Sequence, residues 1–241
     1  MCIQLYKVGP SERIWRSDKL IPSSLREKLL RAVAPLEVVP DAERDWHPGS
    51  DGFVLNLVHP ALYPIVYGRT VGRLPGSDTA AILVPPEVKG ADPKFVSKHF
   101  QFLPSDFSVD DNGNITFISP YINNIHPTHH KELYSVIQEI LQRALPIFER
   151  VLSDLARPLL PMRITESDYH QSRRKAIIDC HQRYNGDLKV MNNRLSLNGR
   201  ILQVLVRLAN IVLTPERPEY PGGKWHAEGL SQSCSMRVGW H

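Results

Sequence analysis

Apolar residues recur every three or four positions in two parts of the chain, which is the spacing of a helix with one buried face. In the first part, Leu25, Leu29 and Val33 share a face. This helix is expected to begin at residues 24–27, where serine and glutamate have the spacing of a capping box. Pro35 is expected to end it, because proline removes a backbone donor and clashes with the preceding turn.

The second helical pattern is longer and covers residues 128–155. It predicts the main packing helix of the chain, and Pro146 marks a kink or a break between two helices. A more polar helix is expected over residues 168–184. It would end before Gly186, because glycine suits the left-handed conformation that closes many helices.

Alternating and continuous apolar runs predict strands. Residues 107–117 alternate on both sides of Asn112-Gly113, a pair that tolerates the positive φ angles of a tight hairpin turn. Short apolar runs at residues 53–55 and 65–67 predict short strands or irregular packing segments. Residues 201–213 are almost continuously apolar and rich in β-branched side chains, which predicts one long buried strand. One face of that strand would carry Leu202, Val204, Val206 and Leu208, and the other Gln203 and Arg207.

The composition is that of an ordinary folded protein. The 241 residues are 42% hydrophobic and 22% charged, which suits a soluble protein with a sizeable core. Helices and strands in separate stretches predict an α+β fold. Prolines and small polar residues near residues 73–94 predict an extended surface loop. A net charge of +4 from dispersed side chains gives no reason to expect nucleic acid as a partner.

The cysteines and the N-terminus bear on the compartment. Cys2, Cys180 and Cys234 are too few and too widely spaced for a disulfide framework or a cysteine-based metal site. Residues 1–7 lack the features of a secretory signal, and no window approaches the roughly 18 consecutive apolar residues of a membrane helix. We therefore expect an intracellular protein, cytoplasmic or nuclear, without a membrane partner.

The strongest chemical signal is His226 followed two positions later by Glu228. On a strand, positions two apart project to the same face, so the imidazole and the carboxylate can converge on one point. They are two members of the two-His-one-carboxylate facial triad, which leaves open positions on Fe(II). The His-x-Glu pattern is common, and by itself it is more typical of a surface pair.

Six sequence blocks in a fixed order resemble the fungal family known as domain of unknown function (DUF) 4246. The resemblance covers nearly the whole chain. The blocks are residues 17–22 (SDKLIP), 45–50 (DWHPGS), 57–64 (LVHPALYP), 101–107 (QFLPSDF), 121–127 (YINNIHP) and 220–229 (YPGGKWHAEG).

The resemblance implies a protein of several hundred residues whose C-terminal part is similar to a double-stranded β-helix, or jelly roll, of the Fe(II)- and 2-oxoglutarate-dependent oxygenases. His226 and Glu228 would then be metal ligands, followed later by a distal histidine and an arginine for 2-oxoglutarate. On this basis residues 1–200 form an N-terminal α+β region, residues 201–230 begin the β-helix core, and residues 231–241 are an atypical tail.

The family pattern is expected to stop near Leu230, as a frameshift, a retained intron or a wrong gene model would cause. His241 is a formal but unsupported third ligand. We therefore expect an inactive fragment of an oxygenase that acts on an unknown small-molecule or protein substrate and binds neither cofactor stably. An incomplete β-helix would expose an apolar strand and favour self-association. The alternative is a non-catalytic interaction or structural module.

The other polar residues are interpreted mainly as structural or surface residues. Asn123, Asn124 and His126 precede the long helix and are interpreted as turn and capping residues, with substrate contact as the alternative. His129 and His130 are expected to be solvated, and no partner at ligand spacing supports zinc. A metal hydrolase that uses Glu228 as a base would need more histidine ligands than the sequence offers, and nucleophile motifs such as G-x-S-x-G are absent.

Overall fold

The structure, a computed structural model, describes residues 7–8, 14–73, 76–87, 97–156 and 195–223. These residues form two α-helices and several small antiparallel sheets, so the α+β prediction is confirmed. In chain order the elements are β1 (Lys7–Val8), β2 (Trp15–Arg16), α1 (Ser23–Glu37), the 3-10 helix η1 (Asp41–Glu43), β3 (Asp45–Trp46), β4 (Val54–Val58), β5 (Ile65–Val66), β6 (Val71–Arg73), β7 (Ala80–Ile82), β8 (Phe100–Gln101), β9 (Ser105–Val109), β10 (Ile115–Phe117), α2 (Lys131–Leu155), β11 (Ile201–Val204) and β12 (Leu208–Ile211).

The chain divides into two compact units, each made from separate stretches of sequence. Unit 1 comprises residues 1–26, 109–115 and 139–200, and unit 2 comprises residues 27–108, 116–138 and 201–241. No helix within the described ranges is both long and apolar enough to cross a membrane.

Unit 1 is held together by polar contacts to the later part of α2. The indole Nε1 of Trp15 donates to the buried carboxylate of Asp154 at 2.8 Å. The carboxylate of Glu149 accepts from the backbone N–H of Leu197 at 2.8 Å. Buried apolar residues recur along this part of the helix at the spacing of one face, and they are Leu141, Ala144, Leu145 and Phe148.

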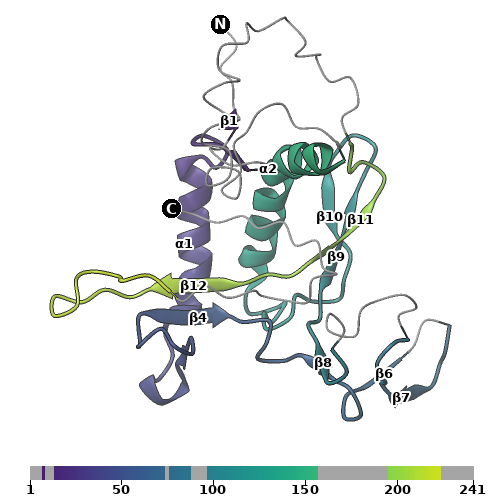
Figure 1. Ribbon diagram of the computed structural model, residues 1–241, viewed down its shortest axis with the longest axis horizontal. Coiled ribbons are helices and arrows are strands. Elements are labelled where there is room, and N and C mark those ends of the chain that lie inside the picture. Colours follow the sequence, from purple (N-terminus) through teal and green to yellow (C-terminus); the bar gives the residue numbers. More distant parts are fainter. Residues whose placement is uncertain (1–6, 9–13, 74–75, 88–96, 157–194, 224–241) are drawn as a thin grey trace, which may run out of the picture. The chain divides into compact units, whose positions relative to one another are not determined.

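Unit 2 contains a three-stranded sheet with strand order β12-β4-β3. Figure 1 shows β12 alongside β4. The central strand β4 is almost entirely buried and supplies Leu55, Leu57 and Val58 to the core. At one end of α1, the carboxylate of Glu37 accepts from the side chain of Asn210 on β12 at 2.7 Å.

The predicted hairpin at residues 107–117 is present as β9 and β10, within the sheet β10-β9-β11. Its turn is looser than expected. Gly113 has a positive φ of 82°, and Asn112 is not among the residues with positive φ. The N–H of Gly113 donates to the carbonyl of Asp110, so a turn closed at the glycine replaces the tight two-residue turn.

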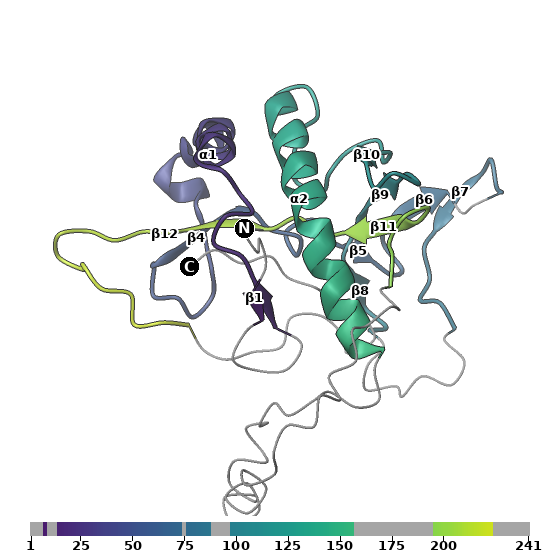
Figure 2. The same cartoon turned by 90° about the horizontal axis from the view of Figure 1, so that it is seen from above.

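The prediction of one long buried strand at residues 201–213 is wrong. The segment forms two short strands, β11 paired with β9 and β12 paired with β4. Figures 1 and 2 show that the chain continues from one to the other as an extended segment. Its even-numbered positions from Leu202 to Leu208 are half-buried, as their shared face predicted, but Ile201 and Ile211 are exposed. The strand is split because the segment changes partner between two sheets.

Both helix predictions hold in their main part and fail at details of their ends. Helix α1 begins at Ser23, and the carbonyl of Pro22 accepts the first backbone hydrogen bonds of the helix. Ser24 therefore lies inside the helix and is not the residue that precedes it. Pro35 lies inside α1 and does not end it. Helix α2 begins at Lys131, later than predicted, and contains Pro146 without a break.

The proline-rich segment predicted as a loop starts with a hairpin instead. Strands β6 and β7 pair through Val71 with Ile82 and through Arg73 with Ala80, and most of their residues are exposed. The surface position is confirmed for the described residues 76–87, although they contain a strand. The helix predicted over residues 168–184 lies outside the described residues.

Candidate functional site

The metal ligands expected from the sequence, His226 and Glu228, lie outside the residues that the structure describes. Their placement on one face of a strand stays a prediction. Within the described part of the chain, no group of three or more His, Cys, Asp or Glu residues is arranged to hold a metal ion.

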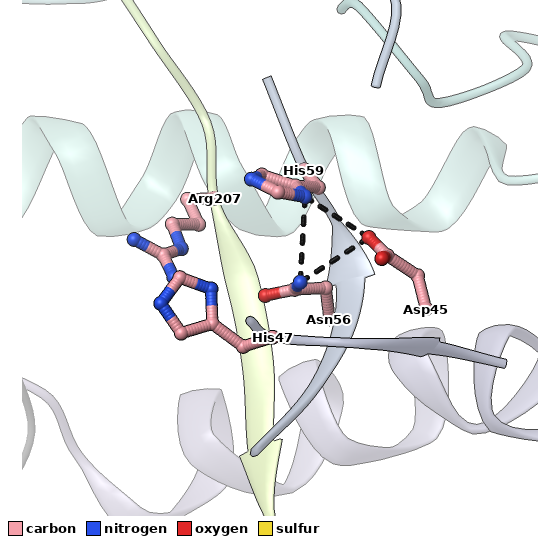
Figure 3. A network of polar contacts seen from close by, with 5 residues as sticks. All are labelled: Asp45, His47, Asn56, His59 and Arg207. Atoms are coloured by element: carbon pink, nitrogen blue, oxygen red, sulfur yellow. Dashed lines mark hydrogen bonds and ion pairs between the residues drawn. The ribbon is translucent and has the colours of Figure 1, made fainter. Parts of the chain in front are cut away.

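A cluster of five polar residues in unit 2 is the best-defined candidate site, and Figure 3 shows it at close range. We refer to Asp45, His47, Asn56, His59 and Arg207 as the Asp45 cluster. Asp45 on β3 and Asn56 on β4 are direct cross-strand partners. The other three residues lie just beyond strand ends; Figure 3 shows His59 directed at this pair, with His47 and Arg207 to one side.

One carboxylate oxygen, Oδ2 of Asp45, contacts two other residues of the cluster. Oδ2 of Asp45 lies 2.9 Å from Nδ1 of His59 and accepts a hydrogen bond from Nδ2 of Asn56 at 3.2 Å. Asp45 and His59 are 33% and 20% exposed, so solvent and small molecules can reach the pair. A charged acceptor between two donors makes this the strongest polar contact of the cluster.

The contact with Asp45 decides which nitrogen of His59 carries the proton. A carboxylate only accepts hydrogen bonds, so Nδ1 of His59 must be the N–H nitrogen. The 3.3 Å approach of Asn56 Nδ2 to the same nitrogen then joins two donors and adds no hydrogen bond. In a neutral ring Nε2 of His59 would then carry the lone pair, and no contact with another described residue occupies it.

Asn56 contributes a second acceptor. Its side chain is only 6% exposed, and its Oδ1 is buried without a hydrogen-bond partner within the described structure. Exchanging the amide oxygen and nitrogen would place Oδ1 against the carboxylate of Asp45, so the observed orientation is the favourable one. A buried acceptor without a donor costs about 1–3 kcal/mol.

Arg207 and His47 form the opposite side of the cluster. The guanidinium of Arg207 approaches Nδ1 of His47 at 3.2 Å, and because Arg207 can only donate, Nδ1 of His47 is the acceptor. The rings of His47 and His59 meet edge to face with centroids 6.2 Å apart. In Figure 3, Asn56 Oδ1 and the second ring nitrogen of His59 point away from Asp45, toward the side on which His47 and Arg207 lie.

The sequence did not reveal this cluster, although it contained a partial signal. Asp45, His47 and His59 stand in two of the six family blocks, residues 45–50 and 57–64. Nothing in those blocks indicates that the residues meet, because the contact depends on the register of β3 with β4. Arg207 was expected only to mark the solvated face of a strand.

The residues before α2 behave largely as their turn and capping interpretation predicts. Asn124 has a positive φ of 64°, and Nδ1 of His126 accepts from the backbone N–H groups of Thr128 and His129 at 3.3 Å each. His130 differs from the prediction, since it is half-buried with Nδ1 unpartnered within the described structure. Burial, and then the neighbouring histidines, lower the pKa of His130.

The comparisons with known proteins place the chain in one family. The family model described as Protein of unknown function (DUF4246) matches residues 3–234, and the chain belongs to this family. The match continues past Leu230, where the family pattern was expected to stop. No curated protein and no solved structure matches the chain.

Proposed function

We propose that this member of the DUF4246 family is part of an Fe(II)- and 2-oxoglutarate-dependent oxygenase. The observation that carries the proposal is the His226-x-Glu228 pair, which stands in the last of the six family blocks. A neutral imidazole and a hard carboxylate two positions apart form the donor set that non-haem Fe(II) accepts from protein. The proposal includes a double-stranded β-helix for the segment that carries them.

In this proposal His226 and Glu228 hold the metal from one strand face. Bound Fe(II) with 2-oxoglutarate would supply activated dioxygen for oxidation of a substrate. The proposal assigns two protein ligands, His226 and Glu228. Metal affinity depends on the number of ligands and on the groups that orient them, so we propose weak iron binding and no sustained turnover.

Metal titration of the purified chain tests the proposal. Calorimetry with Fe(II) under anaerobic conditions should show weak binding that His226→Ala and Glu228→Ala each abolish, while His99→Ala, at an exposed histidine, leaves it unchanged. Succinate formation with Fe(II) and 2-oxoglutarate should not exceed that of His226→Ala. Binding that survives both substitutions would refute the assignment of ligands, and turnover above the variant would refute the proposed inactivity.

A non-catalytic interaction module is the second candidate, and one observation favours it. Among the described strands, β11 and β12 are both at sheet edges, and they carry exposed Ile201 and Ile211 at 63% and 56% exposure. Exposed apolar side chains on an unpaired edge are typical of surfaces that add a further strand or partner. The module hypothesis predicts no specific Fe(II) binding, so the same titration separates the two functions.

A further inference from the structure

We propose that three histidines make the start of α2 sensitive to pH, so that the turn before the helix is closed in neutral solution and opens in mildly acid solution. They are His126, His129 and His130, which we call the α2 histidines. All three lie in unit 2. The inference goes beyond the proposed oxygenase function, because it involves neither His226 nor Glu228.

The first step of the argument is that His126 caps this turn only as a neutral imidazole. Its Nδ1 accepts from the backbone N–H groups of Thr128 and His129 at 3.3 Å each, and its carbonyl accepts from the N–H of His130 at 3.0 Å. A protonated imidazole carries hydrogen on both nitrogens, so it would turn a donor toward two N–H donors. Protonation of His126 therefore removes the side-chain cap.

The second step is that protonation collects like charges where a helix tolerates them least. The rings of His126 and His129 are stacked, with centroids 4.1 Å apart and planes 24° apart. Two protonated rings at that separation repel each other. They also lie at the N-terminus of α2, where the helix dipole already places partial positive charge. Both effects add to the loss of the cap and favour opening of the turn.

The third step is that the folded chain also keeps His130 neutral. This residue is half-buried, and its Nδ1 is buried without a hydrogen-bond partner in the described part of the chain. Burial, and then the charges of His129 and His126, lower the pKa of His130. The stabilisation is therefore complete above the ordinary histidine pKa of about 6.5 and is lost as pH falls through the folded-state pKa. Acid thus acts on His130 in the same direction as on the cap.

The groups around the α2 histidines do not hold them in the protonated form. Within the described ranges, no carboxylate forms an ion pair with any of the three. The charges of Lys131 and Glu132 in the first turn of α2 cancel, so this turn offers no net negative charge. Strand β10, whose Phe117 packs on Tyr134, has no titratable side chain. The other titratable groups on α2, before it and on the segment that Asn123 contacts are Tyr134, Tyr121, Tyr63 and His59.

The opening is expected to stay local, because the rest of α2 is held by burial. Leu133, Val136 and Ile137 follow the first turn and are only 0%, 4% and 8% exposed. Their packing does not depend on the protonation of the histidines. Acid should therefore open the turn at residues 126–130 and leave the buried part of the helix folded.

The test compares backbone amide exchange of the full chain at about pH 7.5 and about pH 5, on either side of the ordinary histidine pKa, with each rate corrected for its intrinsic pH dependence. Protection of the amides of Thr128, His129 and His130 should fall about fivefold or more in acid, the worth of one helix cap. Protection of the Ile137 amide should hold. Long-range proton–nitrogen spectra at neutral pH should show His126 as the Nε2–H tautomer, because Nδ1 is the acceptor.

The decisive variant is His126→Asn. Asparagine is a good helix cap, and its Oδ1 stands where histidine has Nδ1 but takes up no proton at these pH values. The variant should keep most of the protection that the unaltered chain loses in acid. His99→Gln removes an exposed histidine elsewhere and is the matched control, so it should lose protection as the unaltered chain does.

Several results would overturn the proposal. An Nδ1–H tautomer for His126 at neutral pH would show that Nδ1 is not the acceptor, and this measurement needs no variant to fold. Equal protection of the turn at both pH values would show that the α2 histidines do not control it. An acid loss as large in His126→Asn would place the cause elsewhere. A parallel loss at Ile137 would mean that the whole helix unfolds.

Discussion

At the residue scale, Tyr134 shows how one side chain closes a turn. Its hydroxyl donates to the carbonyl of Ile125 at 2.7 Å and accepts from the N–H of Ile122 at 2.9 Å. Tyr134→Phe would leave the N–H and the carbonyl of a buried turn without a partner. We expect a loss of about 1–3 kcal/mol in the free energy of unfolding, measured by chemical denaturation. Tyr63→Phe, at an exposed tyrosine, should change stability little.

The pKa of Tyr134 predicts how the stability difference between the unaltered chain and Tyr134→Phe depends on pH. Burial raises the pKa of this phenol, so the folded state favours the neutral form. The stabilisation is therefore present below the ordinary tyrosine pKa of about 10 and is lost as pH rises through the folded-state pKa. The difference between the unaltered chain and Tyr134→Phe should shrink in that alkaline range. A constant difference would contradict the burial of the hydroxyl.

At this scale the sequence allowed prediction of roles that depend on neighbouring residues. It did not allow prediction of contacts between residues far apart in the chain. The roles of Asn124 and His126 follow from neighbours within a few positions, so their turn and capping interpretation could be made and is confirmed. The contact of Asp45 with His59 depends on which two strands pair and in which register. Residue types alone do not contain that information.

At the element scale, α1 tolerates a proline in its last turns. Pro35 is exposed and lies inside the helix, where it cannot donate to the carbonyl of Arg31 four positions earlier. Pro35→Ala should restore this donor without disturbing the core. We expect it to raise the free energy of unfolding by about 1–3 kcal/mol, within the cost of proline in a helix.

Pro40→Ala is the matched control for that prediction. Pro40 caps η1 with φ at −54°, a conformation that proline already favours. Its removal should lower stability by about 0.4–1 kcal/mol, because the unfolded chain gains freedom. Denaturation midpoints that move in the same direction for both variants would contradict the argument for Pro35.

The same scale explains which elements could be predicted. The sequence predicted α1, α2 and the β9–β10 hairpin, because the pattern that specifies each of them lies within one continuous stretch of sequence. Residues 201–213 have an equally clear apolar pattern, but their division into β11 and β12 depends on partners more than ninety residues away, as the pairings of Ile201 with Ser108 and Leu208 with Val58 show. An apolar run predicts a strand but not its partner.

At the scale of the whole molecule, each unit is assembled from three separated stretches of chain. Helices α1 and α2 and strands β9 and β10 each contribute residues to both units. Because no composition change or linker marks these crossings, the sequence could predict the α+β class but not this division. The predicted boundary at residue 200 and the β-helix beyond it stay predictions.

The exposed sheet edges predict that the whole chain self-associates. Truncation after Arg200 would uncover β4 and β9 by removing their partners β12 and β11, so it should not improve solubility. The full chain should instead self-associate through the exposed side chains of those edge strands, Ile201 and Ile211. Replacing both with lysine should raise the monomer fraction in light scattering without unfolding the chain, because charge on an edge disfavours strand addition. Val38→Lys, at an exposed position outside any strand, should have no such effect. A monodisperse monomer for the unaltered chain would show that these edges are already protected.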